Sequence, residues 1–198
     1  MVHENDEQLK AMRYSDGEMP PEERRRHHLE MVAEIARSAQ KEGPLKTEFS
    51  DYPGRELLTV SVDNYAVYDD TYLYFTLPHE RGNILELSAD SRHSPLYWSE
   101  GHRETIRTHV TLPDAVQRIE MIPRDLKWRA PAHGGEISMS TEYSPQEPAE
   151  CTITQDIDLN PAIIPAIEYE CLLDINRKLS HPELFTIVVR MPEASENE

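Results

Sequence analysis

The sequence predicts a mainly β protein: an antiparallel β-sandwich of about eight strands, with an N-terminal helix and a C-terminal helix before the last strand. From Leu57 onward, apolar and polar residues alternate with a period of two, which is typical of strands with one buried face. Prolines and glycines separate these segments, and the polar strand faces favour a sandwich over a parallel sheet. Strands are expected at 58–63, 72–77, 84–87, 106–112, 119–121, 137–143, 151–159 and 184–190.

The first predicted helix covers residues 21–42. The run Pro20–Glu23 is a favourable helix start, because proline fits the first turn and acidic groups complement the helix dipole. Lys41 and Gly43 are expected to close the helix. Its apolar face should lie on the rest of the protein and consist of Leu29, Val32, Ile35, Ala36 and Ala39.

The second predicted helix covers residues 165–180. Pro165 suits its first position, Arg177 complements the dipole near its end, and Pro182 forbids continuation. A buried strand at 184–190 should follow, because that segment is apolar and β-branched on both faces. We expect the helix to be anchored to the sheets chiefly by its first two apolar residues, in a stripe formed by Tyr169, Leu172, Leu173, Asn176 and Leu179.

The length of 198 residues fits one domain with short extensions. We expect that domain at residues 19–191. Residues 1–18 carry many charges with little periodicity and are expected to be a flexible lead-in, and the polar tail at 192–198 is expected to be disordered.

A family resemblance rests on the run IIPAIEYECLLDINRKLSHPELFTIVVR at 163–190, together with YLYFTLP, RHSPLYW and a strand ending at Leu112-Pro113. These motifs resemble the C-terminal β-rich domain of bacterial transglutaminase-like proteins, which as a family carry a papain-like cysteine core before that domain. The resemblance extends from Arg26 to Arg190 and includes no catalytic core. It implies an accessory domain that supports or docks on such a core, and an extracytoplasmic location for a longer parent.

The net charge of −17 narrows the classes of partner. An acidic surface repels phosphate backbones, so nucleic acid is not expected as a partner, although the charge can also serve only to keep the chain in solution. No run of 18 apolar residues is present, so membrane insertion is not expected. The polar, acidic N-terminus is not expected to be a signal peptide.

No motif for catalysis, phosphate binding or metal binding is recognisable, so we expect no enzyme activity, no cofactor and no metal site. The two cysteines, Cys151 and Cys171, lack the spacing of a zinc or redox pair. Neither belongs to a recognisable Cys-His-Asp framework. We expect both to be small buried hydrophobic residues, and a disulfide between them stays open at this stage.

One loop, at residues 90–103, gathers the residue types that are enriched at binding hot spots. It is also locally basic in an acidic protein. The alternative is that Leu96, Tyr97 and Trp98 pack into the edge of the sandwich. The candidate partner-binding residues are Arg92, His93, Tyr97, Trp98, His102 and Arg103.

The leading hypothesis is therefore a non-catalytic accessory β-sandwich domain that docks on a transglutaminase-like core or another protein. The alternative is a carbohydrate- or peptide-binding module that uses the Tyr97/Trp98 loop with nearby Trp128. A hydrolase with an unrecognised site ranks last, and a deep pocket with a histidine beside a carboxylate would favour it.

Overall fold

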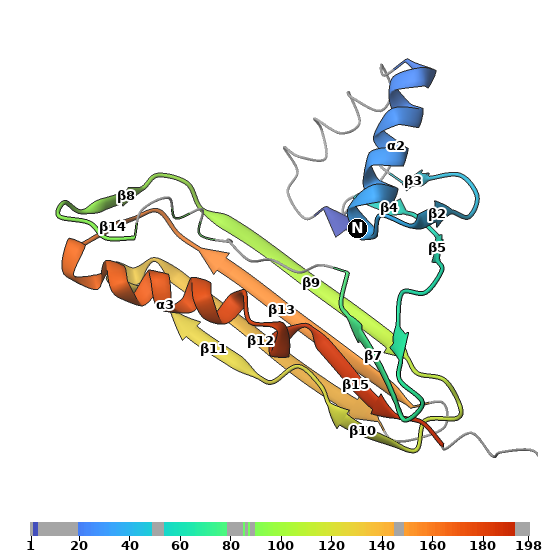
Figure 1. Ribbon diagram of the computed structural model, residues 1–198. Coiled ribbons are helices and arrows are strands. Elements are labelled where there is room, and N and C mark those ends of the chain that lie inside the picture. Colours follow the sequence, from blue (N-terminus) through green and yellow to red (C-terminus); the bar gives the residue numbers. More distant parts are fainter. Residues whose placement is uncertain are drawn as a thin grey trace, which may run out of the picture. The chain divides into compact units, whose positions relative to one another are not determined.

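The computed structural model describes residues 2–3, 20–48, 54–78, 85, 87, 90–144 and 149–192 (Figure 1). Most of the expected lead-in, most of the expected strand at 84–87 and the tail at 193–198 lie outside the described residues. The chain divides into two compact units, Met1–Tyr65 and Ala66–Glu198. The boundary between them falls inside the range 19–191 that the sequence analysis treats as one domain.

The N-terminal unit combines one helix, α2 (Pro21–Ile35), with short strands. The helix starts at Pro21 as predicted, but the predicted extent to residue 42 is wrong, because the chain becomes extended at Ala36 and then pairs as a strand. Strand pairing satisfies backbone groups that a longer helix would otherwise satisfy. The strands form the sheets β1-β4-β3 and β2-β5, with bounds β1 (Val2–His3), β2 (Ala39–Lys41), β3 (Lys46–Glu48), β4 (Gly54–Leu57) and β5 (Val60–Val62).

The apolar face predicted for the first helix is correct only in part. Val32 is buried, with 4% of its surface exposed, whereas Leu29 is 47% exposed. The buried position one turn before Val32 is His28. Helix positions four apart share a face, so α2 rests on a narrow strip that contains a histidine.

The C-terminal unit is built on the four-stranded antiparallel sheet β11-β12-β13-β9. Its long strands pair over ten residues each, and the predicted alternation at 106–112, 137–143 and 151–159 is confirmed within them except at Tyr143, which is exposed. Gly135 opens β12 with φ +101°, where an added Cβ would collide with the backbone of Asp158. The bounds are β9 (His102–Thr111), β11 (Leu126–Arg129), β12 (Gly135–Ser144) and β13 (Glu150–Leu159), with the 3₁₀ turn η1 (Pro131–His133) before β12.

A second antiparallel sheet, β10-β15-β7-β6, shares a hydrophobic core with the long sheet. Its bounds are β6 (Val67–Tyr68), β7 (Tyr72–Thr76), β10 (Arg118–Met121) and β15 (Thr186–Arg190), the last preceded by the 3₁₀ turn η3 (Pro182–Leu184). The shared core is the main contact between the two sheets, and its buried residues are Leu77, Leu112, Met139, Cys151, Ile153, Leu184, Phe185, Ile187 and Val189.

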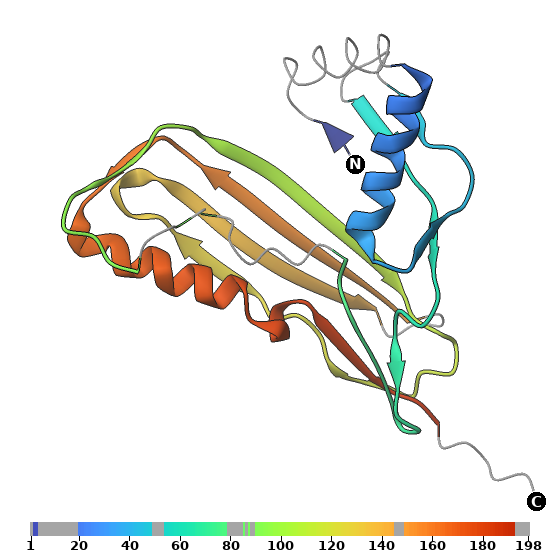
Figure 2. The ribbon, with the colours of Figure 1, turned by 45° about the horizontal axis from the view of Figure 1, so that its top comes forward.

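The helix α3 (Tyr169–Leu179) covers the other end of the same face of the long sheet, against Ile137 and Ile157. Figure 2 shows α3 and β15, which follow each other in the chain, lying along that face. The predicted burial of Tyr169 and Leu172 is confirmed. Ile175, and not Asn176, continues the buried stripe. Counted from Tyr169, positions i+3, i+6 and i+10 lie on one side of the helix, and that side faces the sheet.

A short ribbon of β8 (Leu96–Trp98) and β14 (Ala162–Ile164) precedes α3, with the 3₁₀ turn η2 (Ala166–Glu168) between ribbon and helix. The mainly β class, the antiparallel sheets and the presence of two helices are as predicted. The predicted start of the second helix at Pro165 is wrong, because residues 166–168 form the 3₁₀ turn η2 and the α-helix begins at Tyr169. The described strands form five sheets of two to four strands, so a single sandwich of eight strands is not confirmed. The described strands that the sequence analysis did not predict are β1, β2, β3, β4, β6, β8, β11 and β14.

Candidate functional site

The ribbon of β8 and β14 divides the predicted binding residues between two faces. Ala162, Ile163 and Ile164 pair with Trp98, Tyr97 and Leu96. Because successive strand residues point to opposite faces, Leu96 and Trp98 turn inward and are half-buried, while Tyr97 turns outward. The expectation that all three apolar residues of the loop pack into the fold therefore holds for two of them.

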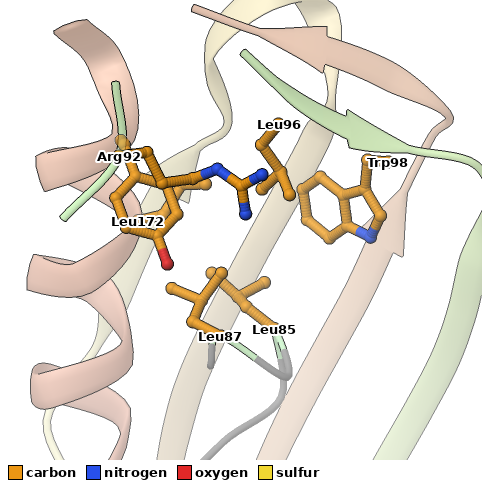
Figure 3. A pocket seen from close by; sticks show the side chains of 7 residues that line it. Leu85, Leu87, Arg92, Leu96, Trp98 and Leu172 are labelled. Atoms are coloured by element: carbon orange, nitrogen blue, oxygen red, sulfur yellow. The ribbon is translucent and has the colours of Figure 1, made fainter. Parts of the chain in front are cut away.

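A cavity of about 80 Å³ lies beneath the inner face of this ribbon. We call it the Arg92 pocket. Helix α3 supplies part of its wall, β8 supplies another part, and the chain before β8 supplies the rest. Figure 3 shows the guanidinium of Arg92 extending toward Leu96 and Trp98. The described residues that line the pocket are Leu85, Leu87, Arg92, Leu96, Trp98, Tyr169 and Leu172.

Arg92 has an unusual environment for a cation. The centre of its guanidinium lies 5.7 Å from the centroid of the Tyr169 ring, within the range of a cation–π contact. Its Nε is shielded from solvent and has no hydrogen-bond partner among the described residues. Buried donors are almost always paired in folded proteins. The Nε of Arg92 is therefore a polar atom of this pocket that has no partner within the described residues.

The other four predicted site residues do not enter this pocket. His93 and Tyr97 are exposed. On β9, His102 Nε2 lies 3.1 Å from an oxygen of Glu104, and Arg103 donates to Asp158 at 2.9 Å. The local basic character expected for the loop is thus reduced by these acidic neighbours. The structure brings Arg92 and Trp98 together and separates them from Tyr97.

The two cysteines are both free thiols. Cys151 is buried in the core between the sheets, and burial raises the pKa of its thiol. Cys171 is half-buried, its Sγ donates to the carbonyl of Glu168 at 2.8 Å, and burial together with Glu168 and Asp174 raises its pKa. A raised pKa keeps a thiol protonated at neutral pH, and the thiolate is the nucleophilic form. Neither environment activates a cysteine.

A second, smaller cavity lies beside Gln155, on the inward face of β13. The side chain is 5% exposed and its Nε2 has no partner within the described part of the chain. The cavity measures about 10 Å³, which is close to the minimum volume for one water molecule. It is too small to be a ligand site, and its neighbours belong to the core.

Within the described ranges, no three histidine, cysteine, aspartate or glutamate side chains are grouped so that they could hold a metal ion. No helix in those ranges is long and apolar enough to cross a membrane.

Sequence reasoning missed five of the seven pocket residues as site residues. It assigned Tyr169 and Leu172 to the core, gave Leu96 only a packing role at the sandwich edge, and gave Leu85 and Leu87 no role beyond a strand. The shared position of Arg92 and α3 has no local signature in the sequence, because the two segments are far apart along the chain. Comparison with protein-family models, with curated proteins and with solved structures finds no match to this chain.

Proposed function

We propose that this chain is a non-catalytic accessory domain whose C-terminal unit docks on a partner protein, and that the partner is a transglutaminase-like catalytic core. The observation that carries the docking role is an exposed apolar surface on the outer face of the β8–β14 ribbon. The resemblance at 163–190 supports the choice of partner, because it covers β14, α3 and β15 of this unit.

The docking surface consists of Tyr97, Ile163 and Ile167, which are 71%, 62% and 90% exposed. Tyr97 and Ile163 are direct cross-strand partners, and such partners have Cβ atoms about 5 Å apart. Ile167 lies in η2, which connects the ribbon to α3. Large apolar side chains exposed together mark interaction surfaces, and aromatic residues are enriched in them.

Charge defines the partner further. The chain carries 37 acidic residues against 20 lysines and arginines. An acidic partner would be repelled during encounter, whereas a basic rim around an apolar patch would be attracted. We therefore expect the partner to present an apolar hollow with basic residues around it.

The proposal also covers the arrangement of the two four-stranded sheets. We interpret the two four-stranded sheets, which share one buried core, as the two layers of the sandwich of about eight strands that the alternating sequence pattern predicts. In this interpretation α3 extends the second layer beyond β15. The environments of the two cysteines support a non-catalytic role, because both thiols have raised pKa values.

The alternative is a carbohydrate- or peptide-binding module built on Tyr97, Trp98 and Trp128. A stacking platform needs aromatic rings exposed on one face, but Tyr97 and Trp98 turn to opposite faces of β8, and Trp128 packs against the core of α3. The structure therefore offers more support for a docking surface with one exposed aromatic residue than for a platform.

The docking proposal is tested by binding of the full chain to a transglutaminase-like catalytic core from the same genome, measured by interferometry. We expect saturable binding that Ile163→Ser weakens at least about tenfold, as is common for central contact residues. The control is Val67→Ser, because Val67 is also an exposed β-branched residue of this unit, on β6. Equal loss in both variants, or no binding by the parent chain, contradicts the proposal.

Two further measurements test the same proposal from other sides. Sedimentation velocity should show that the chain alone does not associate through this surface, and a dimer that Ile163→Ser abolishes would assign the surface to self-association.

The chain should also show no amine incorporation and no peptide hydrolysis. Either activity, if lost on Cys151→Ser or Cys171→Ser in a folded variant, would overturn the non-catalytic assignment.

A further inference from the structure

We propose that the Arg92 pocket binds the carboxylate of a small organic acid, with the acid's apolar part held against the leucines and Trp98. This site does not depend on the docking surface proposed above. The two have no residue in common, and they lie on opposite faces of β8.

The cation of the pocket selects an anion. Arg92 is the charged side chain among the described residues that line the cavity. Its Nε and the neighbouring Nη are parallel donors that match the two oxygens of a carboxylate. The Nε has no partner within the described ranges, and a carboxylate that reaches it as neighbouring side chains change rotamer would satisfy a donor that is otherwise costly to bury.

The same features favour a carboxylate over a phosphate. A phosphate carries more charge and normally draws on several cations or backbone donors, whereas this pocket offers one guanidinium between apolar and aromatic walls. The net charge of −17 adds a general repulsion that increases with the charge of the ligand. A monoanion with an apolar body is therefore the best chemical match.

The volume limits the size of the apolar body. An engineered cavity of about 150 Å³ accommodates benzene, and the Arg92 pocket measures about 80 Å³. The part of the ligand that enters should therefore be smaller than a benzene ring, which corresponds to a short aliphatic chain. Such a carboxylate can come from a free short-chain acid or from the C-terminus of a peptide that ends in a small apolar residue.

The position of Trp98 allows a direct test. The chain has two tryptophans, Trp98 in the pocket and Trp128 outside it. In a Trp128→Phe background, titration with sodium butyrate should change the Trp98 fluorescence saturably, and butyramide, which lacks the charge, should bind at least about tenfold more weakly. N-acetylalanine represents the peptide C-terminus, and its affinity relative to butyrate identifies the source of the carboxylate. Calorimetry on the unmodified chain repeats the comparison without the reporter substitution.

The variant Arg92→Gln should weaken butyrate binding at least about tenfold, while Arg103→Gln should leave it within a factor of about two. Arg103 is a matched control because it is an exposed arginine of the same unit, paired with Asp158 on β13. If Arg92→Gln fails to fold, Arg92→Lys provides the same test, since it keeps the charge but loses the paired donors. Equal affinity for butyrate and butyramide, stronger binding of inorganic phosphate, equal effects at Arg92 and Arg103, or no saturable signal in fluorescence and calorimetry would overturn the proposal.

Discussion

The two described α-helices, each in its own unit, differ in how many side chains they bury, and the longer helix buries fewer among its described residues. α2 has 15 residues, and its described buried side chains are His28 and Val32. α3 has 11 residues and buries four, among them Tyr169 and Leu172. Because short helices owe most of their stability in proteins to an apolar face packed on other elements, α3 should be the more strongly held of the two.

The largest expected effect is the loss of the central contact of α3. Leu172→Ala should destabilise the C-terminal unit by about 2–5 kcal/mol, because it removes a fully buried leucine and leaves a cavity under the helix. Both tryptophans lie in this unit, so denaturant melts followed by tryptophan fluorescence report on it. Leu173→Ala, at a half-buried position of the same helix, is the control and should cost less. A Leu172→Ala midpoint at or above that of the control would mean that α3 does not pack as described.

The corresponding change in α2 should have a smaller effect, confined to its own unit. Val32→Ala removes two buried carbon atoms, which is expected to cost about 1–2 kcal/mol. Hydrogen exchange of the α2 amides should become faster, while the tryptophan fluorescence midpoint of the C-terminal unit should stay that of the parent chain. If Val32→Ala costs as much as Leu172→Ala, the contrast between the helices is wrong.

The sequence predicted those elements whose pattern is long and regular. Strands β9, β12 and β13 alternate over most of their length, so that their faces could be assigned without the structure. The final helix was identified because proline, charges and apolar spacing all agree along one segment. The short strands β8 and β14 were missed, because three residues are too few for a period and their pairing is long-range.

Part of the candidate site could be predicted from the sequence, namely Arg92 and Trp98. The sequence pointed to the loop that contains Arg92 and Trp98, because its residue types are those of binding sites. It could not show that Tyr169 lies beneath Arg92, since contacts between distant segments leave no local pattern. The prediction for the end of α2 was wrong although a local pattern was present. The apolar spacing from Val32 to Ala39 fits a helix, but the chain from Ala39 onward pairs as a strand.

A pH dependence should distinguish the N-terminal unit from the C-terminal one. Burial, then Lys41 and His27, lower the pKa of His28 from its ordinary value near 6.5. The unfolded chain therefore binds a proton at His28 more readily than the folded chain does. The stability of this unit should fall as the pH decreases from about 6.5 through the lowered pKa. Above about pH 6.5, His28 should make no contribution to the pH dependence of stability. Exchange of the α2 amides at pH 7 and pH 5.5, corrected for intrinsic rates, measures this. His28→Leu should remove the difference, and a difference that persists in this variant would assign it to other groups.

The smallest expected effect is at the exposed face of α3. Arg177 and Leu172 lie on the same helix, so a comparison of their variants separates the contribution of burial from that of the helix itself. Arg177 donates to Asp174 at 2.6 Å and to Glu170 at 2.8 Å, and its side chain is 64% exposed. These contacts raise the pKa of Arg177, led by the hydrogen bond to Glu170, but exposed ion pairs contribute little to stability because water and salt screen them. Arg177→Ala should therefore leave the fluorescence midpoint of the C-terminal unit indistinguishable from that of the parent chain, at low and at high salt. If instead Arg177→Ala lowered the midpoint as far as Leu172→Ala does, α3 would be held by its surface charges, and burial would not explain why it differs from α2.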